Sequence, residues 1–204
     1  LHVSLNMTTP AEKTNTLKPQ VVFVLGGPGA GKGTQCSNIV TEFSWIHLSA
    51  GDLLRDERKK NGPHAAMIEE CIVQGKIVPA ELTVELLKNA IMDNTQNGKT
   101  QFLVDGFPRN VDNFAGWKKV LGDSVELLFV LFFDCDEAKM RERLLTRGLT
   151  SGRSDDNDAA IIKRFQTYVT ESRPIIESFD AAGQVRRIDA NRAAFRTRAE
   201  QRTL

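Results

Sequence analysis

Residues 21–34 read VVFVLGGPGAGKGT, an apolar run followed at once by a glycine-rich loop. A short, continuous apolar run is typical of a strand that is buried on both faces of a parallel sheet. The loop ends at Lys32, and the residues after it have helical periodicity. This order of strand, GxxxxGK loop and helix predicts a phosphate-binding loop, because glycines let successive backbone N–H groups point into one concavity.

The residues of this loop also predict how phosphates would be held. The following helix adds the partial positive charge of its N-terminus, and Lys32 adds a full charge for the β and γ phosphates. Gly33 follows Lys32, so the first hydroxyl group comes one position later, at Thr34. We therefore expect phosphate oxygens and water to hold Mg²⁺, with Asp105 binding that water shell and Thr34 as a second candidate ligand.

The rest of the chain alternates between apolar runs and helical patterns. Strands are expected at residues 21–25, 46–48, 102–104, 127–133 and 185–188. Helices are expected at residues 34–43, 51–60, 64–74, 80–94, 111–120, 137–147 and 156–181. Strands that alternate with helices form right-handed βαβ units. The pattern therefore predicts an α/β fold in three layers, with a five-stranded parallel sheet between helices.

Length and composition limit the possible classes. The chain has 204 residues, which fits one domain. Lys and Arg number 27 and Asp and Glu number 26, and this formal net charge of +1 argues against a general binder of nucleic acid or anionic membranes. The longest apolar run, residues 127–133, is far shorter than the roughly 20 residues of a transmembrane helix. Three scattered cysteines support neither a disulfide framework nor a zinc site.

The two ends of the chain carry fewer signals. Residues 1–19 are polar and contain Pro10 and Pro19, so we expect a disordered extension there and a single domain over residues 20–204. Residues 194–204 fit a last helix whose basic excess is a solvated face.

Three later segments carry polar residues where a core would not need them. They are HLSAGDLLR at residues 47–55, GKIVP at residues 75–79 and DGFPRN at residues 105–110. Arg55 and Arg109 lie in turns or at helix ends, where a forked guanidinium group can hold one phosphate with two hydrogen bonds. A surface ion pair would explain either arginine alone, but together with the glycine loop they predict a second phosphate site.

A fourth basic group surrounds a short loop, GLTSGRSDDN at residues 148–157. Arg143 and Arg147 lie four residues apart on one face of the expected helix before it. Arg153 lies inside the loop, and the Asp155–Asp156 pair can orient these arginines or cap the next helix. Such a set is suited to wrapping several phosphates and shutting out water.

These segments, in this order, resemble the nucleoside monophosphate kinases. The resemblance extends from about residue 21 to about residue 192. It implies a helical insert that binds the monophosphate, at about residues 49–78, and a lid at about residues 146–156. The lid is short and has no cysteine cluster for a structural zinc ion.

Within this family, the residues in these motifs are similar to those of the UMP-CMP kinases. Adenylate kinases usually have Thr at the position of Ala50 and Gln at the position of Asn113. An Asn amide offers both an acceptor and a donor, so by rotating it is expected to serve cytosine and uracil alike. The resemblance thus implies MgATP as donor and CMP and UMP as acceptors, with dCMP as a further candidate.

The resemblance also assigns roles to individual residues. It places the ATP site at Gly29, Ala30, Gly31, Lys32, Gly33, Thr34, Arg143, Arg147 and Arg192, the last through its main chain. It places the monophosphate site at Ser49, Ala50, Gly51, Arg55, Lys76, Ile77, Val78, Gly106, Phe107, Pro108, Arg109, Asn113, Arg153 and Arg164. The expected catalytic residues are Lys32, Arg109, Arg147, Arg153 and Arg164. They would act by positioning and by neutralising charge, since the acceptor phosphate is already anionic and needs no side-chain base.

The resemblance further implies a monomer of pyrimidine nucleotide metabolism in the cytoplasm, with the nucleus as a second compartment. Two other functions stay open at this point. An adenylate kinase acting on AMP is disfavoured by Ala50 and Asn113. A nucleotide-binding regulator without catalysis would not need all of the basic side chains Lys32, Arg55, Arg109, Arg147, Arg153 and Arg164.

Overall fold

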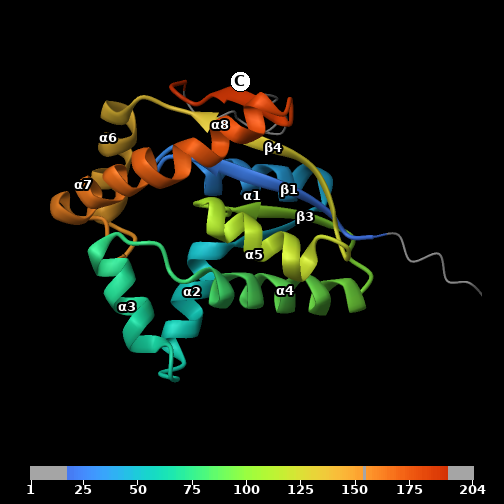
Figure 1. Ribbon diagram of the computed structural model, residues 1–204. Coiled ribbons are helices and arrows are strands. Elements are labelled where there is room, and N and C mark those ends of the chain that lie inside the picture. Colours follow the sequence, from blue (N-terminus) through green and yellow to red (C-terminus); the bar gives the residue numbers. More distant parts are fainter. Residues whose placement is uncertain (1–17, 154, 193–204) are drawn as a thin grey trace, which may run out of the picture.

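The computed structural model describes residues 18–153 and 155–192 (Figure 1). Most of the expected disordered extension, the expected last helix at residues 194–204 and Ser154 of the lid loop lie outside the described residues.

A five-stranded, fully parallel sheet forms the middle layer, with the strand order β2-β3-β1-β4-β5. The strands are β1 (Gln20–Gly26), β2 (Ile46–Ser49), β3 (Gln101–Asp105), β4 (Glu126–Asp134) and β5 (Val185–Asp189). The central strand β1 carries the apolar run, because residues in the middle of a parallel sheet are covered on both faces. Its Phe23 and Val24 are 0% exposed and lie opposite Val104 and Asp105 of β3. The predicted parallel sheet is confirmed.

Helices cover both faces of this sheet. They are α1 (Lys32–Phe43), α2 (Ala50–Lys59), α3 (Ala65–Gln74), α4 (Ala80–Gln96), α5 (Val111–Leu121), α6 (Glu137–Gly148), α7 (Asp158–Thr167) and α8 (Arg173–Ala181). One core packs α4, α5 and α8 against the sheet around Phe23 and Trp117. A second core packs α1, α6 and α7 against the other face around Val22 and Met140. The three-layer α/β fold is therefore confirmed.

One predicted helix is interrupted. The helical pattern over residues 156–181 predicts one continuous helix, but the structure divides it into α7, a π-helical turn at Tyr168–Ser172 and α8. Pro174 lies in the first turn of α8 and has no N–H group to donate to the preceding turn. The wider i→i+5 turn accommodates this break, and such turns are frequent at functional sites.

Two parts of the fold stand apart from the sheet. Helices α2 and α3 extend away from it (Figure 1) and enclose their own small apolar cluster, in which Leu54 and Ile68 pack against Val78 and Leu82. The short segment between α6 and α7 lies next to this helical pair (Figure 1), and its Arg153 contacts Asp52 of α2. Among the described residues, no helix is both long and apolar enough to cross a membrane.

Candidate functional site

The site lies at the carboxyl edge of the sheet, where the chain leaves β1 and β3. From β1 the chain passes through α1 to β2 on one side, whereas from β3 it passes through α5 to β4 on the other side. The connections thus leave the neighbouring strands β1 and β3 in opposite directions. Open α/β sheets bind ligands at such a switch point. A cleft of 370 Å³ opens there, lined by the glycine loop, by Asp105 and by several arginines.

The glycine loop turns sharply between β1 and α1. Gly29 and Gly31 have φ values of 85° and 89°, in the left-handed region that favours glycine. A Cβ atom on Gly29 would also collide with the carbonyl oxygen of Met140, so α6 packs directly against the loop. Gly31 caps α1 without a side-chain hydrogen bond, which leaves the first N–H groups of the helix available to an anion.

Lys32 folds back over this loop. Its Nζ donates to the carbonyl oxygens of Gly26 and Gly27 at 2.9 and 3.0 Å. Burial lowers the pKa of Lys32, and the charges of Arg109 and Arg164 lower it further, whereas Asp105 acts in the opposite direction. Lys32 is thus held at the mouth of the loop in a strongly cationic surrounding.

Arg109 lies in the turn after β3. Its Nε donates to the carbonyl oxygen of Gly106 at 2.9 Å, and its guanidinium group passes over Gly51 of α2. A Cβ atom on Gly51 would lie 3.2 Å from Nη1 of Arg55 and 3.6 Å from Nη2 of Arg109, so the glycine gives both arginines room. Burial, followed by repulsion from Arg164 and Arg55, lowers the pKa of Arg109 to about 10. The cleft therefore concentrates positive charge, as a site for anionic phosphates requires.

The remaining arginines are ordered by two buried carboxylates. Asp156 accepts from Arg147 Nε and Nη2, both at 2.7 Å, and from Arg164 Nη1 at 3.0 Å. Asp155 forms an ion pair with Arg164, with Oδ2 2.9 Å from Nη1, and accepts a hydrogen bond from Arg55 Nη2 at 3.5 Å. Asn157 caps α7 by accepting from the backbone N–H of Ala160. Of the two roles expected for the Asp155–Asp156 pair, the structure thus assigns the orienting one, and the cap belongs to Asn157.

The lid segment and the helical insert touch across the cleft. Arg153 Nη2 donates to Asp52 Oδ1 of α2 at 3.0 Å, and Arg55 Nη1 donates to the same oxygen at 2.8 Å. A second contact joins Thr167 Oγ1 of α7 to the carbonyl oxygen of Gly75 at 2.8 Å. The described conformation therefore brings the cations of both segments together over the phosphate loop.

A second cavity, of 740 Å³, adjoins the glycine loop between α1, α6 and the end of β5. Arg143 forms part of its wall and donates to the carbonyl oxygens of Ala190 and Arg192 at 2.9 and 3.0 Å. Arg192 points its own side chain outward to Asp189, which agrees with a main-chain role only. Ile39 and Ile188 add apolar surface to the wall of the same cavity.

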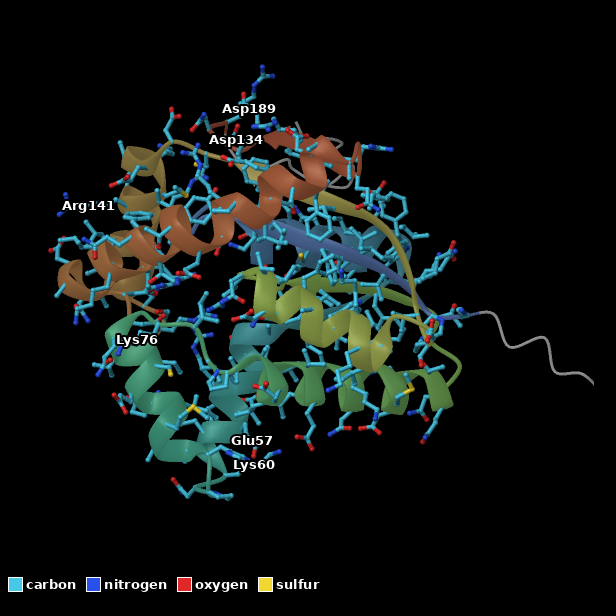
Figure 2. The ribbon with its side chains drawn as sticks, in the orientation of Figure 1. Glu57, Lys60, Lys76, Asp134, Arg141 and Asp189 are labelled. Atoms are coloured by element: carbon cyan, nitrogen blue, oxygen red, sulfur yellow. The ribbon has the colours of Figure 1, made fainter. Side chains whose placement is uncertain are left out.

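A third, smaller cavity lies between α2, α3 and the arginines. Lys76, just after α3 (Figure 2), and Val78 line it together with Arg55. It communicates with the phosphate cleft through Gly51, Arg109 and Arg164, which line both.

Most of the expected site residues line one of these three cavities. Four do not, namely Ala50, Ile77, Phe107 and Asn113. Phe107 is 0% exposed and packs against Phe23 and Trp117 in the aromatic core, with ring centroids 5.9 and 5.6 Å away. Ala50 belongs to the same core. The side chains of these two residues thus face the core and support the site from behind, and their assignment to the monophosphate site stays a prediction.

Asn113 is buried as well. It is 2% exposed, and its Oδ1 accepts from the backbone N–H of Arg109 at 3.2 Å. Rotating the amide would set its NH₂ group against that N–H group, so in this conformation only Nδ2 is left for a base, and the expected rotation between two poses stays a prediction. Asn113 therefore also orients the Arg109 turn.

Sequence reasoning missed several residues of the cleft. His47 approaches Asp105 with Nε2 3.4 Å from Oδ2, and Tyr168 and Ser172 enter from the π-helical turn. The pattern HLSAGDLLR contains His47, but nothing in it indicates a contact with a residue 58 positions away. Burial alone would raise the pKa of Asp105, but the hydrogen bond from His47 and the charge of Lys32 hold it below its usual value.

Comparison with known proteins agrees with this geometry. The sequence profile described as adenylate kinase matches residues 24–184. A UMP-CMP kinase of Gallus gallus is 54% identical over 181 residues, which cover 87% of this chain and 92% of that protein. The UMP-CMP kinases of Homo sapiens and Xenopus laevis are 52% and 53% identical, over the same share of this chain and 92% and 93% of their own lengths.

Proposed function

The chain belongs to the adenylate kinase family, and from this premise we propose that it transfers the γ-phosphoryl group of ATP to CMP and UMP. The products are ADP with CDP or UDP. The protein is thus a nucleoside monophosphate kinase, and its relatives at 52–54% identity carry the name UMP-CMP kinase.

One observation carries the mechanism. Six lysine and arginine side chains line the same cleft, with Lys32 at the glycine loop and Arg55, Arg109, Arg147, Arg153 and Arg164 around it. In phosphoryl transfer the charge is spread over the oxygens of the transferring group, and catalysis consists mainly of positioning and neutralisation. Such a ring of fixed cations supports that chemistry and requires no general base.

The two nucleotides are assigned to opposite ends of the cleft. The ATP phosphates go to the loop at residues 29–34, and the adenine goes to the cavity beside Arg143. The monophosphate goes to Arg55 and Arg109, with its base toward Lys76 and Val78. This order sets donor and acceptor phosphates on either side of Arg153 and Arg164, where both arginines can bind them together.

Magnesium is the expected cofactor, and the residues present fit it. Asp105 Oδ1 is buried at the edge of the cleft and has no hydrogen-bond partner in the part of the chain that the structure describes. Such an oxygen is suited to hold water of a hydrated Mg²⁺ ion, which keeps several of its waters. The hydroxyl of Thr34, which lines the same cleft, is the second candidate. When bound, the ion supplies charge neutralisation at the β and γ phosphates.

We extend the proposal to several properties that follow from the family resemblance. The helical insert would comprise about residues 49–78 and the lid about residues 146–156, as α2, α3 and the segment after α6 support. The protein would be a monomer of pyrimidine biosynthesis in the cytoplasm, with the nucleus as a second candidate compartment, and dCMP would be a further acceptor. An adenylate kinase function is not favoured, since the relatives reported above are UMP-CMP kinases.

An acceptor panel tests this proposal. The purified chain is assayed with MgATP and CMP, UMP, dCMP or AMP, and kcat/KM is compared. We expect the values for CMP and UMP to exceed that for AMP by roughly 100-fold, the scale of discrimination by a shaped pocket. A preference for AMP would replace the proposal by adenylate kinase activity. Turnover with none of the four would favour a catalytically silent nucleotide binder.

A further inference from the structure

Three chemically different ligand groups meet behind the phosphate loop. Cys36 lies on α1, His47 on β2 and Asp105 at the end of β3, and one ligand atom of each lies within 4.8 Å of the others. The sheet register explains the meeting. Ser49 of β2 lies opposite Asp105, so His47, two residues earlier, projects from the same face of the sheet. Helix α1 packs on this face and contributes Cys36 to its core.

The polar groups of this cluster are not fully satisfied by the protein. Oδ2 of Asp105 faces His47, whereas Oδ1 is buried and has no hydrogen-bond partner among the described residues. Asp105 is 8% exposed. A buried polar atom without a partner costs free energy, and a bound cation would satisfy it.

The donor set indicates which cation this would be. A thiolate and an imidazole suit a borderline-soft ion such as Zn²⁺, whereas Mg²⁺ prefers oxygen ligands only. Three protein ligands with a water molecule in the fourth position form a common tetrahedral zinc arrangement. We propose that Cys36, His47 and Asp105 form a binding site for a thiophilic divalent cation of the zinc class. The wide sequence spacing of these residues hides the site, which is why the cysteine pattern alone gives no sign of it.

Binding of the metal ion by these three side chains requires no oxidant or reductant. The Cys36 thiol releases its proton to solvent as the metal–sulfur bond forms. His47 binds through a ring nitrogen, and its contact with Asp105 is replaced by metal–nitrogen and metal–oxygen bonds. Access is from the cleft, because the side chains of His47 and Asp105 are 22% and 11% exposed, whereas Cys36 is fully buried.

Occupation of this site would affect the reaction. His47 and Asp105 line the phosphate cleft beside Lys32. A zinc ion there would take the carboxylate that is assigned to the magnesium water shell, so we expect it to inhibit phosphoryl transfer. This consequence rests on the proposed function, but the binding of the ion does not.

Cobalt substitution tests the site directly. The full chain without nucleotide is titrated with Co²⁺, and absorption is recorded for the thiolate-to-cobalt band and the visible bands of tetrahedral Co²⁺. We expect one ion per chain, displacement by Zn²⁺, and loss of the thiolate band in Cys36→Ser. Cys71→Ser is the matched control, since Cys71 lies on α3 and should leave the band unchanged. Absence of the band in the unsubstituted chain, or its persistence in Cys36→Ser, would overturn the proposal.

A second variant covers the case in which Cys36→Ser fails to fold. His47→Gln keeps the thiol but removes a ligand, and we expect Zn²⁺ affinity, measured by calorimetry, to fall at least about 10- to 100-fold. An unchanged affinity would contradict the site. These measurements need no turnover, and the acceptor panel is run with Mg²⁺ and no Zn²⁺, so each proposal can fail alone.

Discussion

Arg153, between α6 and α7, donates a hydrogen bond to Asp52 of α2, with Nη2 3.0 Å from Oδ1. The same oxygen accepts from Arg55 at 2.8 Å. One carboxylate oxygen of α2 therefore binds Arg55 of the same helix and Arg153 of the segment between α6 and α7, and both arginines are proposed to bind nucleotide phosphates. A bound phosphate would compete with Asp52 for these guanidinium groups.

Asp52→Asn should loosen the lid in the nucleotide-free protein. The Asp52 side chain is 50% exposed, so the loss of stability should be only about 0.2–1 kcal/mol. Amide hydrogen exchange in residues 147–156 should nevertheless become faster, because the bridge to α2 is weakened. Asp56→Asn is the control, since within residues 18–153 and 155–192 Asp56 pairs only with exposed Lys59 on the same helix. Equal exchange in the original protein and Asp52→Asn would show that the bridge does not hold the lid.

Lys32→Met should slow phosphoryl transfer strongly. Removal of a fixed charge that acts on the transferring group should raise the barrier by about 3–4 kcal/mol, which is read from kcat. Lys60→Met is a suitable control, because Lys60 directly follows the last residue of α2 and pairs with Glu57 (Figure 2). Turnover close to that of the unmodified enzyme would exclude Lys32 from catalysis.

Asn113→Asp should weaken the binding of both pyrimidine monophosphates. The carboxylate can still accept from the N–H group of Arg109, as Oδ1 of Asn113 does, but the Nδ2 donor is lost. In both complexes an acceptor atom of the base then faces the new carboxylate oxygen, which is also an acceptor. This mismatch should cost about 1–3 kcal/mol. We expect KM for CMP and UMP to rise while KM for ATP stays constant. If the KM values for CMP and UMP were unchanged, Asn113 would only orient the Arg109 turn.

Asp156 should make stability depend on pH. Burial alone would raise the pKa of Asp156, but its bonds to Arg147 and Arg164 lower it below the usual value. A carboxyl group with a lowered folded-state pKa contributes stability above its unfolded pKa of about 4, and this contribution is lost as pH falls through the folded value.

Asp156→Asn should therefore destabilise the protein at pH 7, by about 2–3 kcal/mol, and much less near pH 3. This figure is below the range for fully buried pairs, because the side chain of Arg147 is 36% exposed. Urea unfolding at the two pH values measures the difference. Asp158→Asn, which breaks an exposed pair with Arg141, should change stability by less than about 1 kcal/mol at either pH. A constant deficit of Asp156→Asn across this pH range would contradict the assigned ion pairs.

The amino-acid sequence by itself determined the features that depend only on residues close together along the chain. The phosphate loop is one, because a strand, glycines with left-handed φ values and a lysine at the helix start follow one another within residues 21–34. The order of strands and helices is another, since periodicity is a local property. The break at Tyr168–Ser172 was missed, because a π-helical turn keeps nearly the same pattern of apolar residues.

Only the tertiary structure decided which distant groups meet. Asp52 and Arg153 are 101 positions apart, and their contact depends on how α2 and the lid segment pack over the sheet. The inward face of Phe107 and the fixed amide of Asn113 likewise follow from packing behind the Arg109 turn. Cys36, His47 and Asp105 come together because α1 covers the face of the sheet on which β2 and β3 are in register. Side-chain contacts between elements depend on strand order and register, which local propensity does not specify.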